Sequence, residues 1–259
     1  MTADALVPDD GARLQSDPRR APRPGGAQSH ARTGTKHARP HASDTTTPAG
    51  EAGASWVPRQ VEQACSSALQ RLNGGTAGSV AVTSSVRGEG RTTLALATAL
   101  AQLHEYGRTV VLLELDVAQP ALAARLGIPA QPGLSDLLAG DVDLEACMHW
   151  PVPSLAVLTA GAASLEPARM LARFARSGIL DQLEESGYCV VADLPPLPPT
   201  GPGDRVVDLF SGTLFVVRAG KTSAATVRTA VSCLSEPPAV VLNARESALP
   251  RWLRNTFGG

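Results

Sequence analysis

The chain has 259 residues, a length that suits one large α/β domain with an appendage. Hydrophobic residues make up 43% of it and aromatic residues only 3%, so we expect an aliphatic core and no aromatic platforms for single-stranded nucleic acid. Its 23 basic and 24 acidic residues give a net charge of -1, which leaves no overall basic field to hold DNA or acidic lipid. Nucleic acid is therefore not expected as a partner.

The four cysteines are widely spaced and form no CxxC pair; they are Cys65, Cys147, Cys189 and Cys233. This spacing predicts reduced core residues rather than zinc ligands or a disulfide framework. The sequence also shows no secretory signal at its start and no apolar run of about 18–20 residues that would span a bilayer. The expected location is the cytoplasm, and the inner face of the membrane would be reached only through a partner.

Residues 1–55 differ in composition from the rest of the chain. The first 50 residues contain 29 Ala, Gly, Pro, Ser or Thr and no aromatic residue, and such a segment cannot bury enough apolar surface to fold. We predict a disordered N-terminal tail over residues 1–55 and a folded domain over residues 56–259. The charges of the tail are mixed, so a weak electrostatic tether to a membrane or polymer is the alternative to a simply solvated segment.

From residue 56 onward, short β-branched runs alternate with amphipathic stretches of helical length. Strands are predicted at residues 80–83, 109–115, 155–159, 188–192, 213–217 and 239–242. Helices are predicted at residues 57–72, 92–103, 165–175, 178–185 and 222–234. The strands are largely continuous apolar runs, as expected of parallel strands covered on both faces. The alternation predicts an α/β fold with a doubly wound, mainly parallel sheet.

The segment between the first predicted strand and the helix after it has the composition of a phosphate-binding loop. Gly88 and Gly90 give the backbone freedom to point successive N–H groups at anionic oxygens, at the positive end of the following helix. Against the pattern GxxxxGK[ST], the four defined positions hold Ser85, Gly90, Arg91 and Thr92, so two of them match. The alternative is an ordinary strand-to-helix turn in which a threonine caps the helix.

Further segments carry recognisable patterns in a fixed order. They are residues 107–116, which end in Glu-Leu-Asp with Pro120 beyond; residues 133–140, which read Gly-Leu-Ser-Asp-Leu-Leu-Ala-Gly; and residues 155–161, 190–196, 216–222 and 240–243. Together with the Gly88-Glu89-Gly90 loop and Thr92, they resemble the bacterial tyrosine-kinase family of capsule and exopolysaccharide synthesis, within the wider ParA/MinD-like group of P-loop ATPases. The resemblance extends over about residues 57–243.

The resemblance implies a P-loop NTPase fold that binds ATP and Mg²⁺, and it assigns roles to particular residues. Those implied in nucleotide binding are Ser85, Gly88, Glu89, Gly90, Arg91, Thr92, Thr93 and Asn243. Those implied in metal binding are Thr92, Asp116 and Asp193. Those implied in catalysis are Arg91, Glu114, Asp116 and Asp193. A membrane polysaccharide co-polymerase, or chain-length regulator, is the implied partner, and a homo-oligomer is implied as well. The alternative for Asp193 is a helix-capping aspartate in a proline-rich turn, and Asn243 either contacts the base or occupies a turn at the end of a strand.

The sequence departs from the family pattern at several positions. Arg91 replaces a lysine, and a planar guanidinium is not interchangeable with a compact ammonium group. Glu114 replaces an aspartate and is longer by about one methylene, roughly an ångström, which is enough to misplace a catalytic base. The Glu-x-x-Arg-x-x-Arg oligomerisation pattern appears only as Glu62, Cys65 and Ala68, and the last residues contain no tyrosine cluster. These departures argue against fast phosphoryl transfer and against ring assembly through that pattern.

Three functional hypotheses follow. The first is an ATP-binding protein that regulates a membrane polysaccharide co-polymerase and that, where active, hydrolyses ATP or phosphorylates protein. The second is a catalytically inactive partner that keeps the nucleotide-binding fold. The third is a positioning ATPase of the ParA/MinD type, and Val86 argues against it because that group carries an additional lysine at this place in the loop.

Overall fold

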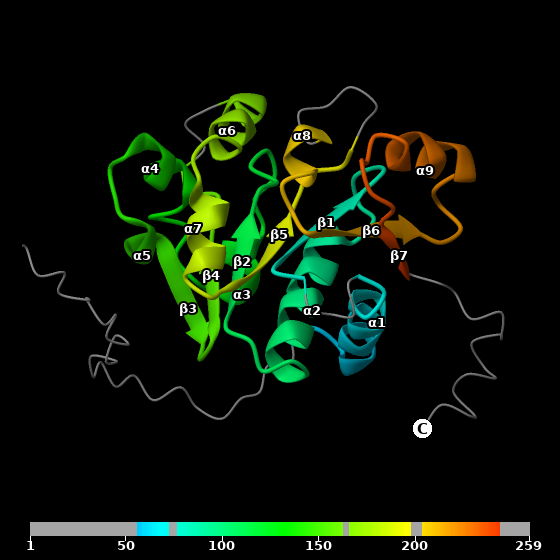
Figure 1. The fold of residues 1–259 in the computed structure, drawn as a ribbon, viewed down its shortest axis with the longest axis horizontal. Coiled ribbons are helices and arrows are strands. Elements are labelled where there is room, and N and C mark those ends of the chain that lie inside the picture. Colours follow the sequence, from blue (N-terminus) through cyan, green and yellow to red (C-terminus); the bar gives the residue numbers. More distant parts are fainter. Residues whose placement is uncertain (1–55, 73–76, 163–165, 198–203, 244–259) are drawn as a thin grey trace, which may run out of the picture. The chain divides into compact units, whose positions relative to one another are not determined.

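Figure 1 shows the fold of the computed structural model, which describes residues 56–72, 77–162, 166–197 and 204–243. The predicted N-terminal tail lies outside these residues. The strands are β1 (Ser79–Ser84), β2 (Val110–Glu114), β3 (Met148–Val152), β4 (Leu155–Leu158), β5 (Cys189–Asp193), β6 (Gly212–Arg218) and β7 (Ala239–Asn243). Within the described residues they form one seven-stranded sheet in the order β3-β4-β2-β5-β1-β6-β7.

Neighbouring strands of this sheet are parallel except for β3 and β4. The central strand β5 pairs with β1 on one side and β2 on the other, so that Val82 and Glu114 both lie opposite Asp193. Parallel strands end at a common edge, and the loops that follow β1, β2 and β5 therefore meet there. The predicted α/β, mainly parallel sheet is confirmed.

Helices cover both faces of the sheet (Figure 1). They are α1 (Arg59–Leu69), α2 (Arg91–His104), α3 (Leu122–Leu126), α4 (Leu134–Ala139), α5 (Leu144–Cys147), α6 (Pro167–Phe174), α7 (Ile179–Glu185), α8 (Asp204–Val207) and α9 (Ala224–Val231). Helices α1 to α3 pack in one apolar cluster, and α4 to α9 pack in another. Side chains alternate along a strand, so Val80 and Val82 join the first cluster and Ala81 the second. The sheet is doubly wound, as predicted.

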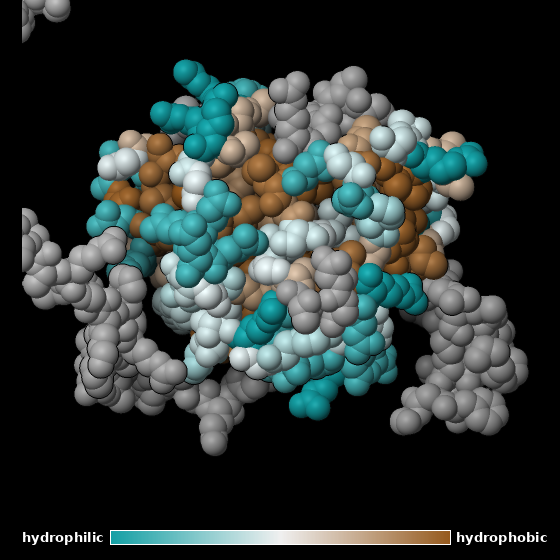
Figure 2. All heavy atoms as spheres, in the orientation of Figure 1, coloured by the Kyte–Doolittle hydropathy of each residue, from teal (hydrophilic) through white to brown (hydrophobic). Residues whose placement is uncertain are grey.

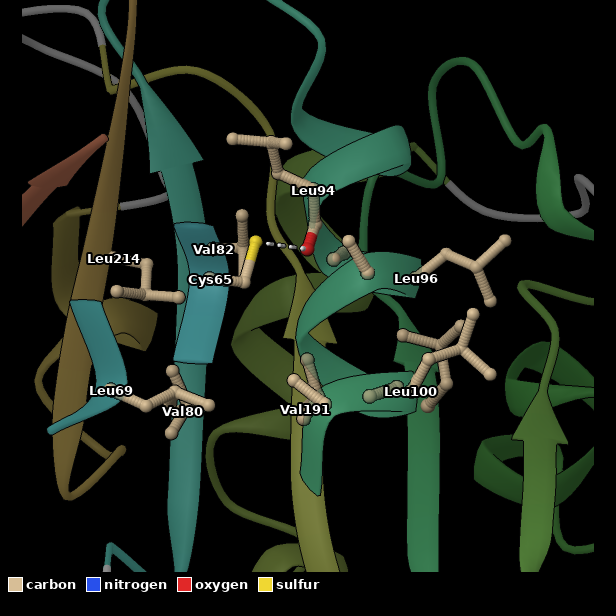
Figure 3. Close-up of a cluster of buried hydrophobic side chains, with 14 of the residues drawn as sticks. Cys65, Leu69, Val80, Val82, Leu94, Leu96, Leu100, Val191 and Leu214 are labelled. Atoms are coloured by element: carbon tan, nitrogen blue, oxygen red, sulfur yellow. Dashed lines mark hydrogen bonds between the residues drawn. The ribbon is translucent and has the colours of Figure 1, made fainter. Parts of the chain in front are cut away.

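The core is mainly aliphatic, as the composition predicts, and the second cluster also buries three phenylalanines, Phe174, Phe210 and Phe215. Figure 3 shows part of the first cluster, in which leucines of α1 and α2 contact valines of the central strands. The thiol of Cys65 lies among them and donates to the carbonyl oxygen of Leu94 at 3.8 Å. Burial raises the pKa of Cys65 to about 11, so this thiol stays protonated and unreactive. All four cysteines are free.

The structure contains elements that the periodicity did not predict. Strand β3 was missed because it is half-exposed, contains Pro151 and lies antiparallel at the edge of the sheet, so it lacks a continuous apolar run. The helices α3, α4, α5 and α8 were missed because each has only four to six residues, too few to show a helical period. Among the described residues, no helix has both the length and the apolar character needed to cross a bilayer.

Two glycines allow the start of α4 to pack against the end of β4. The N–H groups of Leu134 and Ser135 donate to the carbonyl oxygens of Thr159 and Ala160 at 2.8 and 3.1 Å. A Cβ atom on Gly133 would lie 2.5 Å from the backbone nitrogen of Gly161. Only a glycine fits this approach, and that explains why residues 133–140 begin with one.

Candidate functional site

The loop between β1 and α2 has the backbone shape of a phosphate cradle. Gly88 and Gly90 have φ angles of 80° and 93°, a left-handed conformation that favours glycine. Helix α2 begins at Arg91 directly after this loop, so the loop amides lie at the positive end of the helix dipole. The structure thus places the predicted loop residues at a helix N-terminus suited to an anion.

Glu89 ties this loop to the end of β6 and the turn that follows it. The carboxylate of Glu89 accepts hydrogen bonds from the Val86 N–H at 2.9 Å, the Arg218 N–H at 3.0 Å and the Thr222 hydroxyl at 2.5 Å. Burial alone would raise the pKa of Glu89, but these hydrogen bonds outweigh it and lower the pKa below its ordinary value of 4.5. Glu89 therefore carries its negative charge in a bracing role within the loop.

Asn243 braces the same loop from the end of β7. Its side-chain amide donates to the carbonyl oxygen of Glu89 at 2.8 Å, and it lies where a Cβ on Gly90 would stand. The side chain thus contacts the loop backbone, and the predicted contact to the base stays a prediction.

Arg91 forms a buried ion pair at the first position of α2. Its Nη2 atom lies 2.8 Å from Oδ2 of Asp116, and its Nη1 atom donates to the carbonyl oxygen of Leu194 at 2.5 Å. The side chains of Arg91 and Asp116 are only 7% and 5% exposed. Reaching a phosphate would require Arg91 to exchange at least one of these contacts.

A second arginine reaches the same carboxylate. Nη1 of Arg87 lies 3.2 Å from Oδ2 of Asp116 and donates to Oε1 of Gln119 at 2.7 Å. Neither Arg87 nor Gln119 was among the predicted site residues, although a cation inside a phosphate loop was a signal available in the sequence. The structure brings both arginines and Asp116 together at the edge where β1 and β2 end.

Asp116 and Asp193 are fixed relative to each other by the backbone. The N–H groups of Leu115 and Asp116 both donate to the carbonyl oxygen of Asp193, at 2.9 and 3.0 Å. Burial raises the pKa of Asp193 to about 7; the Thr92 hydroxyl and the Arg91 guanidinium oppose the shift, and the nearby carboxylates add to it. Asp193 thus changes its charge near neutral pH.

The acidic pair offers oxygens that fit a divalent cation. Oδ1 of Asp116 and Oδ1 of Asp193 are buried and have no hydrogen-bond partner among the described residues, and unpaired buried carboxylate oxygens are costly. The described residues contain no group of three or more His, Cys, Asp or Glu that could hold a metal by itself. Mg²⁺ is commonly held by one or two carboxylates together with nucleotide phosphates, and these residues fit that arrangement.

Glu114 is directed away from this pair. Its carboxylate accepts hydrogen bonds from the N–H groups of Ala121 at 2.5 Å, Leu122 at 2.7 Å and Ala160 at 3.0 Å, and the residue is 1% exposed. These contacts anchor the start of α3 and the end of β4. The geometry therefore favours a structural role, and the catalytic role expected from the family pattern stays a prediction.

A pocket of about 390 Å³ opens beside the phosphate loop. Its polar lining includes Ser85, Arg87 and Asp116, and its apolar lining includes Leu115, Val117, Pro167, Leu171, Pro195 and Pro196. Figure 2 shows mostly hydrophobic surface between the positions that α6 and α8 occupy in Figure 1. The pocket lining is therefore mainly apolar with a few polar and charged side chains, the usual character of a small-molecule site.

Two curated proteins show related sequences, while no family model matches the chain. The chain is 30% identical over 128 residues to the tyrosine-protein kinase Ptk of Acinetobacter johnsonii. The matched region covers 49% of this chain and 17% of that protein. It is 28% identical over 180 residues to the succinoglycan biosynthesis transport protein ExoP of Rhizobium meliloti, and this match covers 66% of this chain and 22% of that protein. The chain spans less than a quarter of the length of these relatives.

Solved structures share the fold. The kinase domain of VpsO has a TM-score of 0.63 and 28% identity, with 73% of this chain and 98% of that domain covered. The kinase domain of the Escherichia coli tyrosine kinase ETK has a TM-score of 0.60 and 19% identity, with 66% and 70% covered. The cell division ATPase MinD of Pyrococcus furiosus has a TM-score of 0.50 and 21% identity, with 62% and 68% covered. The chain thus has a P-loop ATPase fold, and the resemblance of its sequence to the bacterial tyrosine kinases of capsule and exopolysaccharide synthesis is confirmed.

Proposed function

We propose that the chain is an ATP-binding regulatory domain of exopolysaccharide or capsule synthesis, which acts on a membrane polysaccharide co-polymerase. The observation that carries this proposal is the phosphate loop, with its left-handed Gly88 and Gly90, which Glu89 and Asn243 hold in place beside two acidic side chains. The similarity of the chain to ExoP, a succinoglycan biosynthesis transport protein, supports a role in polysaccharide synthesis.

Different residues at the loop would bind the phosphates and the metal ion. The loop amides would face the phosphates, and Arg91 would reach them by giving up its contact with the Leu194 carbonyl oxygen while it stays paired with Asp116. Thr92, Asp116 and Asp193 would hold Mg²⁺. A bound Mg²⁺ would neutralise phosphate charge. The three metal-binding residues are those that the family pattern implies.

The geometry favours binding over phosphoryl transfer. Arg91 is engaged by Asp116 and by the Leu194 carbonyl, and the carboxylate of Glu114 is occupied by three backbone N–H groups. Transfer depends on accurate positioning of charge, and neither side chain is free for it without rearrangement. A catalytically inactive partner is therefore the second candidate, and it shares the nucleotide site with the first.

Calorimetric titration of the full chain tests the nucleotide site. ADP and a non-hydrolysable ATP analogue are titrated with and without Mg²⁺, beside an Arg91→Lys variant. We expect micromolar, Mg²⁺-dependent binding by the natural chain and tighter binding by the variant, because the shorter ammonium side chain gives up the Leu194 contact and points at the phosphates. Absence of binding by both proteins would refute the proposal.

Co-purification tests the partner. The full natural chain and an Asp193→Ala variant are each produced together with the candidate membrane co-polymerase. For each pair, two quantities are measured: how much co-polymerase is captured with the chain, and how much phosphate is released from ATP. Capture of both proteins without phosphate release supports the inactive partner, whereas phosphate release that requires Asp193 and Mg²⁺ supports an enzyme. Failure of the co-polymerase to bind either protein excludes it as the partner.

A further inference from the structure

One oxygen atom of Asp116 lies between two guanidinium groups. Oδ2 is 2.8 Å from Nη2 of Arg91 and 3.2 Å from Nη1 of Arg87. The GxxxxGK[ST] pattern provides one cation, at the position of Arg91. Arg87 is a second cation, supplied from inside the loop itself, and the proposed function does not use it.

The two arginines are held to different degrees. Arg91 is almost fully buried and has a second anchor on the backbone of Leu194. The side chain of Arg87 is 43% exposed, and its other contact, with Gln119, is also exposed. Partly exposed ion pairs contribute little net stability, so Arg87 can leave Asp116 at small cost, whereas Arg91 cannot.

The position of Arg87 identifies which end of a nucleotide it would meet. A cation at the position of Arg91 reaches the β- and γ-phosphates in the P-loop pattern, and Arg87 touches the same Asp116 oxygen as Arg91. Arg87 also lines the pocket of about 390 Å³ beside the loop. The pocket therefore leaves open space next to Arg87 that is large enough for a phosphoryl group.

We propose that Arg87 is a specificity residue for the terminal phosphate, exchanging Asp116 for that phosphate and making the site prefer ATP over ADP. This inference rests on the proposed nucleotide-binding function. An arginine binds phosphate through strong, often bidentate, charge-assisted hydrogen bonds, and the terminal phosphate brings negative charge that balances the guanidinium. The exchange also leaves Asp116 paired with Arg91 alone, which increases the share of its negative charge that is available to a cation beside Asp193.

The experiment compares two nucleotides in four proteins. The full natural chain, Arg87→Ala, Arg87→Lys and the control Arg125→Ala are titrated calorimetrically with ADP and with a non-hydrolysable ATP analogue, each with Mg²⁺. Arg125 is an exposed arginine of α3 and lies outside the site. Thermal unfolding of each variant establishes that it is folded.

We expect Arg87→Ala to weaken binding of the ATP analogue about tenfold and that of ADP less than about twofold, because one charge-assisted contact is lost only with the triphosphate. Arg87→Lys should keep part of the preference, and Arg125→Ala all of it. An equal effect on both nucleotides, or no effect on either, overturns the inference while the proposed function stands. No binding of either nucleotide by the natural chain overturns the proposed function and, with it, the inference.

Discussion

Asp193 illustrates how burial sets the charge of a single residue in this site. The side chain is 1% exposed at the end of the central strand β5, and burial raises its pKa to about 7. The folded state therefore favours the neutral acid, and the stability that protonation provides is lost as pH rises from the ordinary pKa of 3.8 through about 7.

Replacing Asp193 by asparagine should therefore stabilise the nucleotide-free protein more at high pH than at low pH. Thermal unfolding of the natural chain and Asp193→Asn at about pH 8 and about pH 5 measures this difference, because the buried negative charge is present only at the higher pH. A gain of equal size at both pH values would show that Asp193 is not protonated near neutral pH.

Glu89 behaves in the opposite sense. Its pKa lies below 4.5 because hydrogen bonds to the carboxylate outweigh burial, so its contribution to stability is present above that pH and is lost as pH falls through the lower folded-state value. We expect Glu89→Gln to lower the unfolding temperature at neutral pH and to approach the natural chain in acid. Circular dichroism melts across this pH range provide the test; a penalty that persists unchanged in acid would argue against the assigned charge.

At the scale of elements, the contact between β4 and α4 depends on a glycine, which has no side chain. Gly133 faces the backbone of Gly161 so closely that a Cβ would overlap it. Backbone on both sides leaves little freedom to relax, and overpacking of this kind costs about 1–3 kcal/mol.

Gly133→Ala should lower the free energy of unfolding by about 3 kcal/mol, the upper end of that range. The matched control is Gly127→Ala, whose φ of 65° is strained for alanine but whose Cβ would meet nothing within 4 Å, so about 1 kcal/mol is expected. Urea denaturation measures both values. Equal losses in the two variants would mean that the close approach relaxes easily.

The same elements show what sequence could and could not predict. The long apolar strands and the helix after the phosphate loop were predicted because burial on both faces and helical periodicity are visible in the residues themselves. The edge strand β3 was missed because an exposed, proline-containing strand has neither pattern. The family resemblance assigned the loop and its acidic neighbours to one site, but the arginine contacts to Asp116 and the backbone contacts of Glu114 depend on side-chain directions that spacing does not determine.

At the scale of the whole described domain, the site links segments that are far apart along the chain. Asn243 ends the last strand of the sheet and holds Glu89, 154 residues earlier, by one hydrogen bond. This contact ties the edge strand β7 to the phosphate loop. A bracing role and a base-contacting role for Asn243 predict different results.

If Asn243 braces the loop, Asn243→Ala should weaken the binding of ADP and of GDP by the same factor. That factor is about fivefold, because the loss of one hydrogen bond costs about 1 kcal/mol. Competition titrations with the two nucleotides measure the ratio of their affinities. A changed ratio would show that Asn243 reads the base; Ser223→Ala, at the cap of α9, is the control for a general loss of stability.

The carbonyl oxygen of Asp193, which accepts two hydrogen bonds, bears on which divalent ion the proposed metal site would select by size. Because the backbone that directly follows β2 is bonded to that carbonyl through the successive N–H groups of Leu115 and Asp116, the Cα atoms of Asp116 and Asp193 cannot move apart without breaking these hydrogen bonds. The spacing of neighbouring strands, about 4.8 Å, is a constant of sheet geometry. A divalent ion held by these carboxylates, as the proposed function requires, would be bound within a backbone frame of fixed width, and such rigidity would favour the small, octahedral Mg²⁺ over the larger and more adaptable Ca²⁺.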